Sequence, residues 1–373
     1  MIYFDHNATS PLLPAARDAW LDASSRFIGN PSSPHRLGAR AEAALARARE
    51  KLALSLGCRP AEIVWTGGAT ESNNTILAHL AASRTGEAWI SAIEHPSVLQ
   101  AARRWFPGRL RLIPVTSQGV IDLVWLKREL ATAMKTSQPA FVAVMAANNE
   151  TGVIQPWQDV GALCRAWSLP FFCDASQWLG KMPAAGLGSC EFISACAHKF
   201  GGPQGVGFIK STEPLLPLLL GGRQEDGSRA GTENVAGVLA MIAALEARAG
   251  TDLLSAHLAQ RAHFEAALIA AMPDCEIVGN ASARLWNTVC VIMPEIDCRQ
   301  RWVVKLDKLG FAVSTGSACA SGREKPSYVL AAMGLTSEKA ARVLRLSSAP
   351  ETAPADWLAL LDGLLCARKE LGA

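Results

Sequence analysis

The sequence predicts an α/β protein: a mainly parallel β-sheet flanked by helices, followed by a smaller α+β domain. Strand-like apolar runs alternate with helical periodicity over residues 35–249. The runs are almost continuously apolar, which is typical of parallel strands buried on both faces. With 373 residues, the chain is also too long for one small hydrophobic core.

Each element has its own signal. Apolar residues recur at helical spacing from His35 to Gly57, and Gly57 is a typical residue after a helix end. Pro96 is placed to open a helix, and further helices are predicted over 159–167 and 235–249. Buried strands are predicted at 62–66, 88–93, 110–115, 140–145 and 170–173. The runs 192–195 and 206–209, joined through glycines, predict an antiparallel pair.

The pattern changes after residue 255. A helix over 257–271 is followed by short strands and helices, and the last helix spans about 355–371. We therefore predict a large domain of residues 13–255. A small domain is expected from residues 1–12 and 256–373, carrying a mobile cysteine loop at about 314–326.

Composition limits the function classes. The 36 Lys and Arg against 33 Asp and Glu give a net charge of +3 without a basic stripe, so nucleic acid is not an expected partner. No signal peptide and no membrane-spanning run is evident, which predicts a cytoplasmic location and no membrane association. The ten cysteines are scattered without a Cys-x-x-Cys pair, so a metal site is not expected.

Polar groups follow several predicted strands, where open α/β sheets bind ligands. The turn at 66–70 leads into a helix, and its free N–H groups with Thr70 suit a phosphate, although an ordinary glycine turn has the same pattern. His95 suits stacking or proton transfer, and also a purely structural role. Asn149 suits hydrogen bonding to a phenolic oxygen, or a plain turn.

Asp174 and Lys199 end two further strands. A lysine that forms a Schiff base and an aspartate that pairs with a pyridinium nitrogen are what pyridoxal phosphate requires of a protein. The alternative for Asp174 is a helix N-cap, and most lysines are solvated surface groups. Cys319 lies in a stretch rich in glycine, serine and alanine, which favours a mobile loop over a buried position.

Taken together, these segments resemble the cysteine desulfurases, class-V aminotransferases of pyridoxal-phosphate fold type I, and in particular their NifS-like branch (group I). The resemblance covers nearly the whole chain. It is carried by residues 3–9, 29–35, 69–73, 94–95, 148–152, 174–177, 198–199, 229–232 and 316–319.

The resemblance implies a role for each matching residue at a pyridoxal 5'-phosphate site. Lys199 would bind the cofactor covalently, and Asp174 would pair with its ring nitrogen. Gln177 and Asn149 would contact its phenolic oxygen, and His95 would stack on the ring. The implied ligands of the phosphate are Ala69, Thr70, His198 and the residue at position 196, together with Thr232 from the other subunit of a homodimer.

The resemblance also implies the reaction. Arg345, with Asn149 nearby, would bind the carboxylate of L-cysteine. Cys319, as a thiolate, would take the substrate sulfur as a persulfide and leave L-alanine. The sulfur would pass to an acceptor, such as an iron–sulfur scaffold protein. The C-terminal extension that many family members use for docking is not expected here.

Three positions depart from the family pattern. Cys196 replaces the usual serine, and a thiol is the weaker hydrogen-bond partner. Arg223 replaces a glycine, which predicts an extra cation near the site. The segment 346–350 that follows Arg345 also differs.

Two other functions fit the same motifs. A selenocysteine lyase, or another pyridoxal-phosphate lyase or transaminase, would leave Cys319 a bystander. A non-catalytic scaffold is disfavoured because Lys199, Asp174, His95 and Cys319 are all present.

Overall fold

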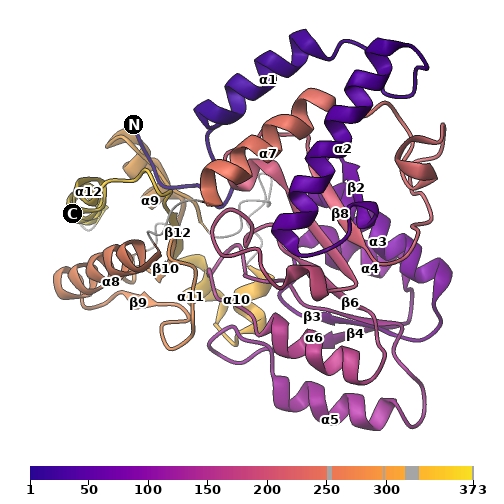
Figure 1. The fold of residues 1–373 in the computed structure, drawn as a ribbon. Helices are drawn as coiled ribbons and strands as arrows, with labels where there is room; N and C mark the ends of the chain where they lie inside the picture. The colour runs from indigo at the N-terminus through magenta and orange to yellow at the C-terminus, as the bar shows by residue number, and fades with distance from the viewer. Residues whose placement is uncertain (250–253, 297–298, 316–326, 372–373) are drawn as a thin grey trace.

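A computed structural model describes residues 1–249, 254–296, 299–315 and 327–371 (Figure 1). Its largest sheet has seven strands in the order β2-β8-β7-β6-β5-β3-β4. Every neighbouring pair is parallel except the two pairs that β8 makes with β2 and β7. The strands are β2 (Ile63–Thr66), β3 (Ala88–Ser91), β4 (Leu110–Ile113), β5 (Phe141–Ala143), β6 (Phe171–Asp174), β7 (Phe192–Cys196) and β8 (Gly207–Ser211). The predicted mainly parallel sheet is confirmed.

Helices cover both faces of this sheet, as Figure 1 shows. On one face pack α1 (Pro14–Arg26), α2 (Arg36–Leu56), α5 (Leu123–Ala133), α6 (Trp157–Ala166) and α7 (Val235–Ala249). On the other face pack α3 (Ala69–Ser83) and α4 (Pro96–Trp105). Successive strand residues point to opposite faces, so Trp89 joins the first hydrophobic cluster while Ala88 and Ile90 join the second.

Local signals explain where several elements begin and end. Gly57 has φ 76° directly after α2, a conformation that glycine adopts without a Cβ penalty. Pro96 occupies the first position of α4. The strand predicted at 110–115 was expected to be buried. It forms as β4 but lies at the sheet edge, so Leu112 is 44 % exposed.

Most of the C-terminal elements gather at one side of the molecule, on the left in Figure 1, whereas the two short helices within residues 328–341 lie nearer the middle. The C-terminal elements include the sheet β12-β10-β9 and a helix layer. Their bounds are α8 (Leu254–Ala271), β9 (Glu276–Ile277), β10 (Thr288–Ile292), α9 (Arg299–Lys308), β11 (Phe311–Ala312), α10 (Tyr328–Ala332), α11 (Ser337–Ala341), β12 (Val343–Ser347) and α12 (Pro354–Leu371).

The N-terminal strand β1 (Ile2–Tyr3) pairs with β11, and Phe4 packs with Trp302 and Trp357 in a separate hydrophobic cluster. These contacts support the division into two domains, which stays a prediction. In the described ranges, no helix combines the length and the apolar character that crossing a membrane requires.

Candidate active site

A cavity of about 550 Å³ opens at the carboxyl ends of β2, β3, β5, β6 and β7. The strands β2 and β7 are both antiparallel to β8, so they run in the same direction and end at the same sheet edge. Ten of the predicted site residues line this cavity: Ala69, Thr70, His95, Asn149, Asp174, Gln177, Cys196, His198, Lys199 and Arg345. Residues far apart in the sequence therefore meet at one place.

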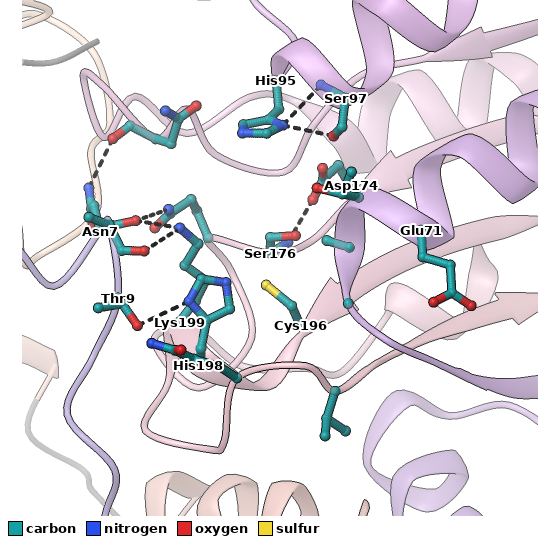
Figure 2. A pocket seen from close by; sticks show the side chains of 18 of the residues that line it. Asn7, Thr9, Glu71, His95, Ser97, Asp174, Ser176, Cys196, His198 and Lys199 are labelled. Atoms are coloured by element: carbon teal, nitrogen blue, oxygen red, sulfur yellow. Dashed lines mark hydrogen bonds between the residues drawn. The ribbon is translucent and has the colours of Figure 1, made fainter. Parts of the chain in front are cut away.

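Lys199 ends a short 3₁₀ turn directly after β7. Its Nζ atom donates hydrogen bonds to the backbone oxygens of Asn7 and Ala8, at 2.8 Å each. Figure 2 shows the lysine reaching toward Asn7, on the side of the pocket opposite Glu71. The N-terminal segment thus provides the polar contacts that hold the amine in the cavity.

Asn7 connects several parts of the site and was not predicted from the sequence as a functional residue. It is 1 % exposed. Its Nδ2 donates to the backbone oxygen of Asn149 (3.2 Å) and to Thr288 Oγ1 (2.9 Å). Its Oδ1 accepts from Asn287 Nδ2 (3.0 Å) and Lys181 Nζ (2.9 Å). These bonds keep the Asn7 carbonyl directed at Lys199.

His95 immediately precedes α4, and its ring is fixed by Ser97. The backbone N–H of Ser97 donates to Nδ1 at 3.1 Å, and the Ser97 hydroxyl lies 2.7 Å from the same atom. An Nδ1 that accepts carries no proton, so the neutral ring holds its proton on Nε2. Burial lowers the pKa of His95, with Lys199 adding to the effect and Asp174 opposing it. The ring is therefore neutral at neutral pH.

Asp174 is the last residue of β6, and two hydrogen bonds orient its carboxylate. Oδ1 accepts from the backbone N–H of Ser176 (2.9 Å), and Oδ2 accepts from Asn73 Nδ2 (3.0 Å). No helix begins after Asp174, since the following residues form turns, so the N-cap alternative is wrong. The carboxylate is positioned to face a ligand in the cavity.

The helix α3 begins at the cavity without a capping side chain. Gly68 precedes it with φ 140° and has no side chain that could cap the first helical N–H groups. A Cβ at Gly207 of β8 would lie 2.7 Å from the Cα of Gly68, so glycine at 207 permits the turn to pack against the sheet. Uncapped N–H groups and the helix dipole favour an anion here.

The residues present fit pyridoxal 5'-phosphate. Two cavity atoms, Asn149 Oδ1 and Ser176 Oγ, are buried without a hydrogen-bond partner among the described residues, and buried polar atoms ordinarily have one. A ligand with hydrogen-bonding groups would satisfy them. Ser176 lies within the segment 174–177, but it was not predicted from the sequence as a functional residue.

Two residues expected to contact the cofactor phosphate, Cys196 and His198, have shifted pKa values. Burial raises the pKa of Cys196 to about 11, so this residue is a neutral thiol. Burial, with Lys199 and Lys181, lowers the pKa of His198 to about 4, and its Nδ1 lies 3.1 Å from Thr9 Oγ1. The thiol is a poor hydrogen-bond partner at this end of the cavity.

The expected substrate ligand Arg345 has protein partners of its own. Its side chain is 1 % exposed, and one nitrogen lies 2.7 Å from Asp5 Oδ1. Another nitrogen donates to the backbone oxygen of Asn149 at 3.1 Å. These contacts orient the guanidinium at the cavity wall.

Two predicted residues lie outside the lining of this cavity, and the position of a third is not described. Thr232 is exposed and does not line the cavity of its own chain. Arg223 is also exposed and outside the cavity lining of its own chain, so an extra cation near the site stays a prediction. Cys319 and residues 316–326 of the predicted loop lie outside the described residues. No group of His, Cys, Asp or Glu in the described part of the chain is arranged to hold a metal ion.

Comparison with known proteins agrees with this geometry. The aminotransferase class-V family model matches residues 2–356. A cysteine desulfurase from Klebsiella pneumoniae is 36 % identical, covering 93 % of this chain and 87 % of the relative. Another, from Rhodobacter capsulatus, is 36 % identical, covering 98 % and 96 %.

Solved structures share the fold of this chain. A NifS-like protein from Rickettsia africae has a TM-score of 0.86 and 29 % identity, covering 99 % of both chains. A structure described as SspA in complex with cysteine has a TM-score of 0.81 and 28 % identity, covering 95 % of this chain and all of the other. The chain therefore belongs to the class-V aminotransferase family of pyridoxal-phosphate-dependent enzymes and, within it, to the cysteine desulfurases.

Proposed function

We propose that this protein is a cysteine desulfurase that converts L-cysteine to L-alanine and passes the sulfur through Cys319 to an acceptor. The observation that carries the proposal is the cavity itself. It brings the Lys199 amine, the Asp174 carboxylate and an uncapped helix N-terminus together in one space. The cysteine desulfurases among its relatives favour this activity over a selenocysteine lyase or another lyase or transaminase.

Different cavity residues would contact different parts of the cofactor. Asp174 would pair with the ring nitrogen, and Asn149 and Gln177 would contact the phenolic oxygen. The start of α3, with Thr70, His198 and Ser176, would hold the phosphate. When bound, pyridoxal 5'-phosphate supplies a ring that withdraws electrons from the substrate Cα.

The protein's own groups move the protons. The Lys199 amine would remove the proton from the substrate Cα. Two backbone oxygens at 2.8 Å accept hydrogen bonds from this amine, and they stabilise the ammonium that forms. Neutral His95 holds a proton on Nε2 for donation. Arg345 binds the substrate carboxylate.

Cys319 carries out the sulfur transfer. Its thiolate forms a bond to the substrate sulfur, and the carbon–sulfur bond of the substrate breaks. The electron pair of that bond stays with the carbon skeleton, which takes up a proton and leaves as alanine. The persulfide on Cys319 then passes its terminal sulfur to an acceptor protein.

The exposed position of Thr232 supports a homodimer in which this residue contacts the partner's cofactor phosphate. Arg229, in the same short segment, pairs with Glu71 at 2.8 Å, and this ion pair holds the segment beside α3. The cytoplasmic location and an iron–sulfur scaffold protein as acceptor stay predictions.

One incubation tests the proposal. The cofactor-loaded protein is mixed with L-cysteine, and alanine, sulfide released by a reductant and mass added at Cys319 are measured. Wild type should form alanine and gain one sulfur atom. Cys319→Ala should form no persulfide, while Cys366→Ala, which removes an exposed thiol, should behave as wild type. Absence of alanine from the wild-type protein contradicts the proposal.

A further inference from the structure

A second lysine, Lys181, lies behind the cavity wall. Its Nζ atom donates to Asn7 Oδ1 at 2.9 Å and to Gln177 Oε1. Its backbone oxygen accepts from Trp286 Nε1 at 2.8 Å, which fixes the main chain at this point. The ion pairs found among the described residues do not include Lys181, so its amine meets two amide oxygens and no carboxylate.

This contact decides which end of the Gln177 amide faces the cavity. A lysine amine acts here as a donor, so the atom that it contacts must be the amide oxygen. The NH₂ group of Gln177 therefore points the other way, and it donates to the Asn7 backbone oxygen at 2.9 Å. Without Lys181, the two ends of the amide could exchange by rotation about its last side-chain torsion.

The same argument applies to Asn7. Its Oδ1 is fixed by Lys181 and Asn287, so its Nδ2 is directed at Asn149 and Thr288.

The role of Lys181 does not depend on its charge. Both Lys181 contacts need only two N–H donors, which the charged and the neutral amine each have. Burial lowers the pKa of Lys181 well below its ordinary value, and Lys199 and Arg345 lower it further.

We propose that Lys181 is a positioning residue that keeps the NH₂ group of Gln177 available to donate to the phenolic oxygen of the bound cofactor. This inference rests on the proposed function. Gln177 is 4 % exposed and lines the cavity, whereas Lys181 acts through it and does not itself line the cavity. A flipped amide would present an oxygen to the phenolic oxygen and repel it.

The test is a pH titration of the visible absorbance of the cofactor-loaded protein without substrate. A donor to the phenolic oxygen weakens the hold of that oxygen on the proton of the Lys199–cofactor linkage. Lys181→Met, which keeps the length of the side chain but has no donor, should therefore raise the titration midpoint by about one pH unit.

Lys210→Met is the matched control. Lys210 is buried, donates to the Cys190 backbone oxygen and lies outside the cavity lining, so its loss should leave the midpoint unchanged. Gln177→Leu removes the donor itself and should raise the midpoint as Lys181→Met does. The double variant should show no larger shift than Gln177→Leu alone.

A wild-type midpoint in Lys181→Met, an equal shift in Lys210→Met or additive shifts in the double variant would overturn the inference. If Lys181→Met does not fold, Gln177→Leu still tests it, since an unchanged midpoint there removes the contact on which the proposal depends. Alanine formation by the wild type is measured on the same preparation. Its absence contradicts the proposed function, whereas the titration requires no turnover, so the two failures are distinguishable.

Discussion

The side-chain amide of Asn73 joins Asp174 to Ser97. Nδ2 donates to Asp174 Oδ2 at 3.0 Å and to Ser97 Oγ at 2.8 Å. Because Ser97 also contacts His95 Nδ1, one buried amide links the carboxylate expected at the ring nitrogen to the histidine expected above the ring. This hydrogen-bond network therefore fixes the positions of Asp174 and His95 relative to each other.

Loss of this amide should weaken cofactor binding. Asn73→Ala leaves Asp174 with one fewer hydrogen bond and releases Ser97, so the dissociation constant of pyridoxal 5'-phosphate should rise about fivefold to tenfold. Titration of the cofactor-free protein measures this change. The adjacent Asn74 donates to the Thr70 backbone oxygen within α3, and Asn74→Ala is the control. Equal effects of the two substitutions would mean that the network has no specific role.

The thiol at position 196 should weaken retention of the cofactor. A buried neutral thiol is a poor hydrogen-bond partner for a phosphate, and a hydroxyl would add a net 1 kcal/mol or so. Cys196→Ser should therefore lower the cofactor dissociation constant about fivefold, as measured by equilibrium titration. Cys290→Ser, at a buried cysteine of β10, should leave this constant unchanged. Identical constants for wild type and Cys196→Ser would refute the prediction.

Arg345 should control substrate binding more than cofactor binding. Arg345→Lys loses the planar fork that pairs with a carboxylate, so the KM for L-cysteine should rise about tenfold or more. Alanine formation at varied cysteine concentration gives KM, and absorbance titration gives cofactor affinity. An unchanged KM would exclude Arg345 as the carboxylate ligand. Asp5→Asn weakens the ion pair that orients the guanidinium and should raise KM by a smaller factor.

His6 should make the fold less stable in mild acid. Burial, with a contribution from Lys181, lowers the pKa of His6 to about 4 from its ordinary 6.5. Above pH 6.5 both states are neutral and His6 has no effect. As pH falls from about 6.5 to about 4, the unfolded state binds a proton that the folded state does not, so the free energy of unfolding decreases by about 1–3 kcal/mol.

Urea unfolding at pH 7 and pH 5 tests this effect. His6→Gln removes the titrating ring, so the free energy of unfolding should fall less between the two pH values than in wild type. His263→Gln, at an exposed position of α8, should retain the wild-type difference. If wild type and His6→Gln lose the same amount, another group causes the acid sensitivity.

The sequence was sufficient to predict ten of the residues that line the cavity. Asp174 and Lys199 each follow an apolar strand, and parallel strands bring their carboxyl ends to one edge. The roles of Asn7 and Lys181 were not predictable in this way. Asn7 contacts Asn287 and Thr288, which lie in another part of the fold, and no local periodicity encodes such a pairing.

The turn that follows Arg223 is a second feature that sequence patterns do not predict. The direction of its segment depends on Glu225, whose carboxylate pairs with Arg49 of α2 at 2.9 Å and accepts from the backbone N–H of Trp65. Glu225 also has φ 48°, an uncommon value for a residue with a side chain. A strained turn held by a distant arginine leaves no recognisable trace in composition or spacing.

The close approach at Gly207 limits how this site can change. Any side chain there would meet the oxygen of Ala195 at 2.5 Å and the Cα of Gly68 at 2.7 Å. Both contacts are backbone, so no rotamer change relieves them. A mutant library designed to accept a larger cofactor analogue can vary the side chains that line the cavity, but it must keep glycine at position 207.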